Sequence, residues 1–387
     1  MNNIKEPSLN QDATRLALLL SHHNENLVVH SGTEWEALID LASKNEVSQM
    51  LFTALRTKQI TPPPIIDDRI RNIHLASVIQ NSKRYHDLAQ ILQAFESAAV
   101  TVVPVKGAWL GEEVYSNIAL RGMGDIDLWV DRSEIEAART TMQSLGYASE
   151  GNRDDRPRAL QEEVLGEIQF FKSGSPMIEL HWTNFPGEWL RHVSQIDEKL
   201  IWQRTLPYKG NYIRQLSAED AIIHISIHLA VNHQMSMSGL RTLIDIDTLR
   251  RKLTVDWTIL ALRAREWHVV TPLWLVLSLL GCIFGDSENK LPLKELQPSV
   301  LRRWLLEKFV SPQGLFKGLV ITEGPMRFIF LILLIDKPVD AMRLIWRTLV
   351  PDHKWLTLRY GLQDAPQWRI ILQRIWHPLS IALKREI

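Results

Sequence analysis

The chain of 387 residues contains a single cysteine, Cys282. One thiol cannot form an intramolecular disulfide, which excludes a disulfide-stabilised secreted scaffold and fits a reducing compartment. Cys282 lies in an apolar stretch, residues 276–284, so we expect a buried small hydrophobe there. The first residues also lack the basic-then-apolar order of a secretion signal. We therefore predict a cytoplasmic protein.

The sequence also lacks a net charge and a long hydrophobic run. It has 44 basic and 44 acidic residues, so no overall field attracts nucleic acid or an anionic bilayer, although a local basic site stays compatible with this total. The most apolar segments, residues 273–284 and 328–335, are shorter than the ~20 residues that a membrane span requires. Neither a nucleic-acid partner nor a membrane span is predicted.

The pattern of apolar residues changes twice along the chain, which predicts an α+β protein with three regions. Residues 1–98 show helical periodicity, with prolines 62–64 preceding a long helical segment. Residues 99–215 read as a small mixed α/β core, and residues 216–387 as a larger all-helical domain. The predicted fold is thus a small mixed sheet embedded between two helical regions.

Within the central region, alternating patterns predict the strands. Residues 100–105 form a β-branched run, and a helix is expected from Gly107 to about residue 115. Ser133 is a candidate cap for a helix over residues 134–145, which Gly146 would end. Residues 167–171 and 177–182 then predict a hairpin.

The most informative segment is Arg-Gly-Met-Gly-Asp-Ile-Asp-Leu-Trp-Val, residues 121–130. Side chains two apart on a strand point to the same face, so Asp125 and Asp127 would project together while Ile126 and Leu128 face a core. Two neighbouring carboxylates repel each other unless a cation lies between them, and oxygen ligands of this kind suit Mg²⁺ shared with substrate phosphates.

A third acid follows in the predicted hairpin. In the segment Ile-Glu-Leu-His-Trp, residues 178–182, Glu179 and His181 share one face. If this strand lies beside that of Asp127, Glu179 completes a three-carboxylate cluster, with Glu167 as the substitute candidate. Three carboxylates are enough protein ligands for a site with two Mg²⁺ ions about 3.5–4 Å apart, or with Mn²⁺ in their place.

Nucleotide transfer also needs a site for phosphates. Lys106 and Gly107 lie at a predicted strand-to-helix turn, where backbone N–H groups and a lysine can converge on an anion. Arg121 is a candidate for a bidentate phosphate contact, and an ordinary ion pair is its structural alternative.

The ordered set of these motifs resembles the uncharacterised nucleotidyltransferase family of bacteria within the DNA polymerase β-like superfamily. The residues that carry the resemblance occur in this order: Lys106-Gly107, Tyr115, Arg121, Asp125-Ile-Asp127, Gly146-Tyr147, Glu179-Leu-His181-Trp182, Glu219-Asp220, His224, His228, Asp245, Pro351 and Arg359-Tyr360.

The resemblance implies Mg²⁺-dependent transfer of a nucleoside monophosphate from an NTP, with pyrophosphate as the leaving group. It implies Asp125, Asp127 and Glu179 as the acidic triad, and Lys106, Gly107 and Arg121 as nucleotide contacts. His181 could stack or hydrogen-bond near the base, or have a structural role. One departure is that Lys106-Gly107-Ala108 replaces the usual Gly-Ser or Gly-Gly pair at the phosphate turn. The acceptor stays open among a sugar, a small molecule, a peptide and a protein.

Other patterns favour structural roles. His224 and His228 are four apart, but Ile225 follows His224, so the His-Glu-x-x-His zinc motif is absent. We interpret them as packing or pocket-lining histidines. The fourteen tryptophans could form a sugar-binding face, yet helix packing explains them better.

Two other functions compete with the leading prediction. A degenerate nucleotidyltransferase would bind nucleotide or a partner without turnover. A sugar-nucleotide glycosyltransferase would use Asp-x-Asp for Mn²⁺, but it needs a series of strands and helices ahead of the motif, where this sequence predicts about 100 helical residues and one strand.

Overall fold

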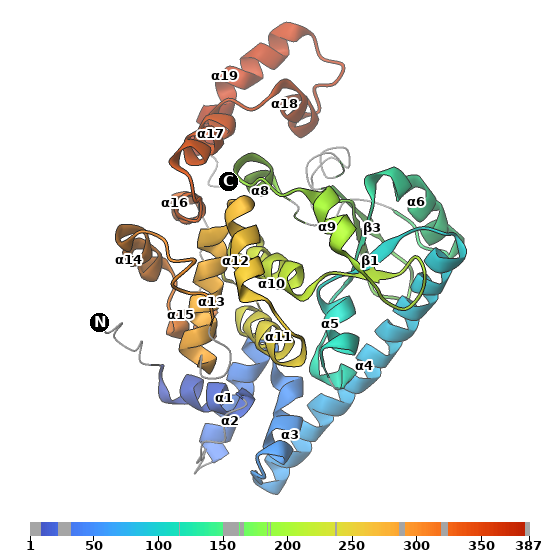
Figure 1. Ribbon diagram of the computed structural model, residues 1–387, viewed down its shortest axis with the longest axis vertical. Coiled ribbons are helices and arrows are strands. Elements are labelled where there is room, and N and C mark those ends of the chain that lie inside the picture. Colours follow the sequence, from blue (N-terminus) through green and yellow to red (C-terminus); the bar gives the residue numbers. More distant parts are fainter. Residues whose placement is uncertain are drawn as a thin grey trace.

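The computed structural model describes residues 9–21, 32–115, 117–149, 162, 166–183, 185, 187–236, 238–285, 291–318 and 324–383. A small sheet lies on one side of a mostly helical molecule, which confirms the predicted α+β class (Figure 1). Within the described residues no helix is both long and apolar enough to cross a membrane.

The sheet has four strands in the order β1-β2-β4-β3. They are β1 (Val102–Pro104), β2 (Ile126–Val130), β3 (Glu167–Phe170) and β4 (Ile178–His181). β2 and β4 are parallel, whereas β1 pairs with β2 and β3 with β4 in antiparallel fashion. The predicted hairpin is confirmed as β3 and β4, and its second strand does lie beside the strand of Asp127.

The two faces of the sheet differ in chemistry because side chains alternate along each strand. Ile126, Leu128 and Val130 belong to one hydrophobic cluster with Ile178 and Leu180. The alternate positions, which include Asp127 and Glu179, face the other way.

Two helices cover the apolar face. α4 (Pro64–Ser97) begins with a proline at its first helical position, where the missing N–H costs nothing, and it runs diagonally along the lower right edge of the molecule beside the sheet region (Figure 1). Its Leu88, Ile91, Leu92 and Phe95 recur at helical spacing and pack into the cluster of the sheet. α6 (Ile135–Ser144) adds Ala138 and Met142.

Two helices pack on the side of the sheet that carries the alternate positions: α9 (Glu198–Arg204), which follows the four strands in sequence, and α5 (Gly107–Glu113), which lies between β1 and β2. Trp129 of β2 stacks on Trp202 of α9, with ring centroids 4.1 Å apart. α5 leaves β1 on this side and packs on β2. These contacts enclose the carboxylates between the sheet and helices.

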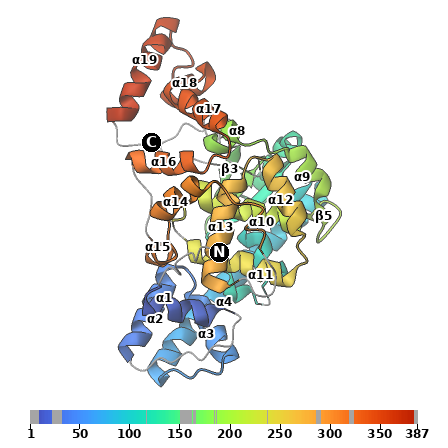
Figure 2. The ribbon, with the colours of Figure 1, turned by 60° about the vertical axis from the view of Figure 1, so that its left-hand side comes forward.

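Helices from both ends of the chain share the larger hydrophobic cluster. The amino-terminal ones are α1 (Gln11–Leu20), α2 (Gly32–Lys44) and α3 (Ser48–Thr57). The others, shown in Figures 1 and 2, are α8 (Glu188–Val193), α10 (Ala218–Ile227), α11 (Gly239–Lys252), α12 (Trp257–Glu266), α13 (Val270–Phe284), α14 (Val300–Phe309), α15 (Pro312–Lys317), α16 (Gly324–Leu333) and α17 (Pro338–Leu349). α18 (His353–Tyr360) and α19 (Gln367–Leu383) lie outside this cluster, and α19 contacts both α17 and α18. A short ribbon, β5 (Leu206–Pro207) and β6 (Arg214–Gln215), precedes α10.

Two local predictions were wrong. Asp131, not Ser133, supplies the capping carboxylate, which accepts from the Ser133 N–H at 2.8 Å and opens a 3₁₀ turn before α6. Cys282 is exposed on α13 rather than buried, because an apolar stretch in a helix still presents one side to solvent. Gly146 does end the helix, with a φ of 81°.

Candidate active site

Asp127 and Glu179 are opposite each other on β2 and β4. The parallel register pairs Asp127 with Glu179 and Trp129 with His181, so both strands direct their polar side chains to one face. Asp125 lies two residues ahead of Asp127, immediately before β2. The sheet therefore brings the three predicted carboxylates to one region.

Asp127 is the electrostatic centre of this region. The residue is 3% exposed, and its Oδ1 accepts from Lys106 Nζ at 2.7 Å and lies 3.0 Å from His181 Nε2. Burial alone would raise the pKa of Asp127, but the Lys106 ammonium and His181 outweigh it and hold that pKa below its ordinary value. Asp127 is thus an anion at neutral pH.

His181 connects the acids to one another. Its Nε2 lies 3.5 Å from Glu179 Oε2, and its Nδ1 lies 3.4 Å from Glu167 Oε2. Burial opposes the charged ring, but hydrogen bonds to Asp127 and Glu179 raise the pKa of His181 to about 9. These acids therefore favour the protonated imidazole.

Asp125 shows the opposite perturbation. Burial, followed by the negative charges of Asp127 and Glu179, raises the pKa of Asp125 to about 6, although Lys106 acts against this. The site therefore disfavours a third negative charge. A bound cation would relieve this repulsion.

The donor set fits a divalent metal ion. Asp127, Glu179 and His181 each offer one ligand atom, and these atoms lie within 4.8 Å of one another. This group contains His181 where the sequence predicted Asp125. Two carboxylates suit Mg²⁺ or Mn²⁺, and an imidazole is a common ligand of transition metals. An ion held by Asp127 would compete with the Lys106 ammonium for Oδ1.

Glu179 also has a partner that the sequence analysis missed. Gln169 of β3 is its register neighbour, and Gln169 Nε2 donates to Glu179 Oε1 at 3.0 Å. The alternation of β3 puts residues 167 and 169 on one face, which was the available signal. Gln169 orients the carboxylate and leaves its second oxygen toward His181.

The turn from β1 into α5 fixes Lys106 above the acids. Lys106 has a φ of 51°, which is uncommon for a residue with a Cβ. At Gly107 a Cβ would lie 2.9 Å from Met123 Cγ, so the following loop approaches the backbone closely. Tyr85 of α4 donates to the Gly107 carbonyl at 3.0 Å.

Arg121 lies in a buried ion pair. Its Nε donates to both carboxylate oxygens of Asp245 on α11, at 2.8 and 2.9 Å, and Tyr115 donates to the same carboxylate at 2.7 Å. Burial opposes the charge of Arg121, but Asp245 outweighs it and raises the pKa of the guanidinium. In this structure Arg121 therefore joins the sheet region to the helical region, and its phosphate contact stays a prediction.

A family model described as an uncharacterised nucleotidyltransferase matches residues 31–285. The chain belongs to this nucleotidyltransferase family. The same comparisons find no match among curated proteins or solved structures.

The nucleotidyltransferase match includes every predicted site residue and both sides of the Arg121–Asp245 pair. It supports nucleotidyl transfer at a general level, and it ends just after α13. The helices from α14 to α19 lie beyond the matched range.

His224 is a buried, neutral histidine of the helical region that follows the sheet. It is 4% exposed on α10, and its Nδ1 has no hydrogen-bond partner in the described structure. Burial, with a smaller contribution from Lys106, lowers the pKa of His224 to about 3. Its ring lies 5.3 Å from that of Phe185 and 6.4 Å from that of His228. The aromatic contacts agree with a packing or pocket-lining role.

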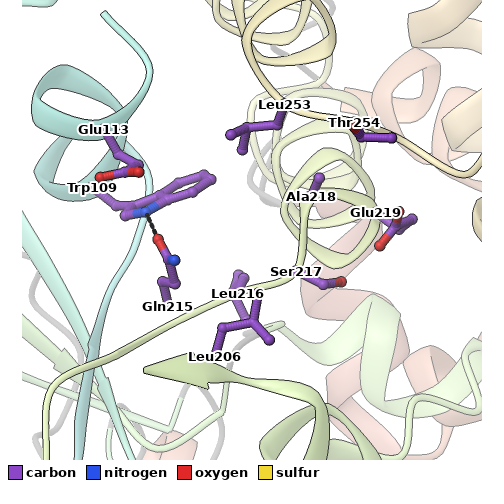
Figure 3. A pocket seen from close by; sticks show the side chains of 10 residues that line it. All are labelled: Trp109, Glu113, Leu206, Gln215, Leu216, Ser217, Ala218, Glu219, Leu253 and Thr254. Atoms are coloured by element: carbon purple, nitrogen blue, oxygen red, sulfur yellow. Dashed lines mark hydrogen bonds between the residues drawn. The ribbon is translucent and has the colours of Figure 1, made fainter. Parts of the chain in front are cut away.

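A separate cavity of about 270 Å³ lies between α5, β6 and the start of α10 (Figure 3). Trp109, Glu113, Gln215, Leu216 and Glu219 are among its lining residues, and Trp109 Nε1 donates to Gln215 Oε1 at 2.8 Å. None of the lining residues is a predicted site residue.

Proposed function

We propose that this protein is a Mg²⁺-dependent nucleotidyltransferase that transfers a nucleoside monophosphate from an NTP to a hydroxyl or phosphate oxygen of an acceptor. A bond forms between that oxygen and the α-phosphorus, and the α–β bridging bond breaks to release pyrophosphate. The observation that carries the proposal is the pairing of Asp127 with Glu179 across parallel strands, inside a chain of this family.

Asp125, Asp127 and Glu179 are the residues proposed to hold the metal. When bound, Mg²⁺ offsets phosphate charge and lowers the pKa of an attacking hydroxyl. Asp127 is already anionic, and deprotonation of Asp125 becomes favourable once positive charge is present. Glu179 is the proposed base for the acceptor proton, because Gln169 holds its carboxylate in place.

Lys106 and Gly107 are the proposed phosphate contacts. A metal ion on Asp127 would weaken the bond between its Oδ1 and Lys106 Nζ, which leaves the ammonium available for a phosphate oxygen. His181 is proposed to position Asp127 and Glu179 through Nε2, with a ligand role once its proton is displaced.

The glycosyltransferase alternative is less compatible with the architecture. The described residues ahead of β1 form helices and no strand, so the series of strands and helices that such an enzyme needs is absent from this part. The degenerate alternative rests on the Lys106 ammonium at Asp127, which neutralises the acid without a metal.

One experiment separates these functions. Wild-type protein is incubated with Mg²⁺, each labelled NTP and a lysate, and products are analysed by mass spectrometry. A mass increment of one nucleotide on a protein or metabolite, absent with Glu179→Gln and retained with the exposed control Glu136→Gln on α6, supports transfer. Nucleotide binding without any product would favour the degenerate alternative.

A further inference from the structure

The solvent face of α17 is apolar. Val339, Met342, Trp346 and Leu349 are all exposed, and their spacing of three or four residues places them on one side of the helix. Leu344 on the other side is buried, where α17 packs on α8. No described residue covers this row, although it includes a large exposed tryptophan and a methionine.

α19 repeats this arrangement. Trp368, Ile371, Leu372, Ile375 and Trp376 are exposed at positions that again form one side, while Ile370 is buried. α17 and α19 contact each other, and both views show them with α18 projecting from the helical body (Figures 1 and 2). We call the nine exposed apolar residues of the two helices the α17/α19 face.

The segment from α17 to α19 carries a net positive charge, unlike the whole chain. Residues 338–383 contain six Lys or Arg and three Asp or Glu, whereas the chain has no net charge. Asp340 is buried and accepts from Arg343, and Asp352 caps α18. The positive excess is therefore local.

Cations lie directly beside the apolar rows. Arg343 and Arg347 follow Met342 and Trp346 on α17, and both side chains are about half exposed, Arg343 at 2.9 Å from Asp340 and Arg347 at 3.9 Å from Asp352. On α19 the Arg369 guanidinium lies 5.6 Å from the Trp368 ring. Tryptophan with flanking arginine is the composition of helices that lie at a membrane interface.

We propose that the α17/α19 face binds the surface of an anionic lipid bilayer. Apolar side chains would enter the region between headgroups and acyl chains, the indoles would lie at headgroup level, and the arginines would contact phosphates. The helices would lie on the bilayer, since no described helix is able to span it. A second copy of the chain fits less well, because it would bring two positively charged surfaces together.

The test is co-flotation of the full chain with vesicles at 0.1 M salt. We expect binding to phosphatidylcholine vesicles with 30% phosphatidylglycerol to exceed binding to pure phosphatidylcholine by at least about tenfold. The double variant Trp346→Ala/Trp376→Ala should lose this binding. Trp304→Ala on α14 is the matched control, because Trp304 is 54% exposed but outside the face. Circular dichroism of each variant excludes unfolding.

Three results would overturn the proposal. One is equal binding to neutral and anionic vesicles, or none to either. Another is anionic binding that the double variant retains. The third is a stable dimer in sedimentation that the double variant converts to monomer, which would assign the face to a second copy.

Discussion

Gln169, at the register position opposite Glu179 on β3, donates a hydrogen bond to one oxygen of the Glu179 carboxylate, while the other oxygen lies 3.5 Å from His181. A carboxylate held on both sides has little rotational freedom to lose when it takes a proton or a ligand. This constraint makes Glu179 the most informative position for mutation, since its removal leaves the buried Asp127 pairs in place.

Replacing Glu179 with Gln should lower nucleotidyl transfer by about 10²- to 10⁴-fold, because the proposed base and one metal ligand are lost together. The amide keeps the side-chain volume, so the thermal unfolding temperature should change little. Single-turnover rates with saturating NTP measure the effect. A variant that turns over at the wild-type rate would remove Glu179 from the mechanism.

Because the pKa of Asp125 is raised, its ionisation at neutral pH lowers the free energy of unfolding of the protein without metal. Its pKa of about 6 lies above the ordinary value of 3.8, so its neutral form is the one that the fold favours. The contribution of neutral Asp125 to the free energy of unfolding is fully present below about pH 4 and is lost as the pH rises through about 6. Asp125→Asn should therefore stabilise the metal-free protein at pH 8 by about 1–3 kcal/mol and have little effect at pH 4.

Denaturant unfolding in EDTA at the two pH values measures this difference. Addition of Mg²⁺ at pH 8 should stabilise the wild type more than Asp125→Asn, because the ion removes the repulsion. An equal response to Mg²⁺ in both proteins would exclude Asp125 as a ligand.

The Arg121–Asp245 pair should stabilise the junction between the sheet and α11. Both groups are almost fully buried, so Asp245→Asn leaves an uncompensated guanidinium and should cost about 3–5 kcal/mol. The double variant Arg121→Met/Asp245→Leu should recover much of this loss, and Asp364→Asn, at an exposed position, is the control. If the double variant loses as much free energy of unfolding as the two single variants at Arg121 and Asp245 lose together, the two charges are not coupled.

Gly107 is predicted to be required by close packing. A methyl group there would meet Met123 Cγ, so Gly107→Ala should cost about 1–3 kcal/mol and displace Lys106 from Asp127. Adding Met123→Ala makes room and should restore the NTP affinity of the glycine variant. If affinity is not restored, the glycine serves a direct phosphate contact rather than packing.

Local patterns were enough to predict the class of the fold. Two-residue alternation in residues 126–130 and 178–181 predicts which side chains share a face, and it is a property of the strand alone. The pairing of Asp127 with Glu179 in the same register needed the structure, since alternation leaves the neighbour and the offset of a strand undefined.

Contacts between distant segments were beyond prediction from the residues. Arg121 and Asp245 are 124 positions apart, and no periodicity links them, so the sequence favoured a phosphate contact for Arg121 and could not identify its acidic partner. His181 was placed on the face of Glu179, but its bond to Asp127 depends on how β2 and β4 align. At Asp127, His181 and Arg121 the charged partners outweigh burial, and those partners are brought together by the packing of the whole chain.

Calorimetric titration of each NTP into the wild type and Glu179→Gln, with Mg²⁺ and with EDTA, tests the central claim most directly. The account predicts that at least one NTP binds the wild type only with Mg²⁺, that Glu179→Gln weakens this binding at least about tenfold, and that Glu136→Gln does not. NTP binding that is the same in EDTA and in Glu179→Gln, or no NTP binding at all, would contradict it.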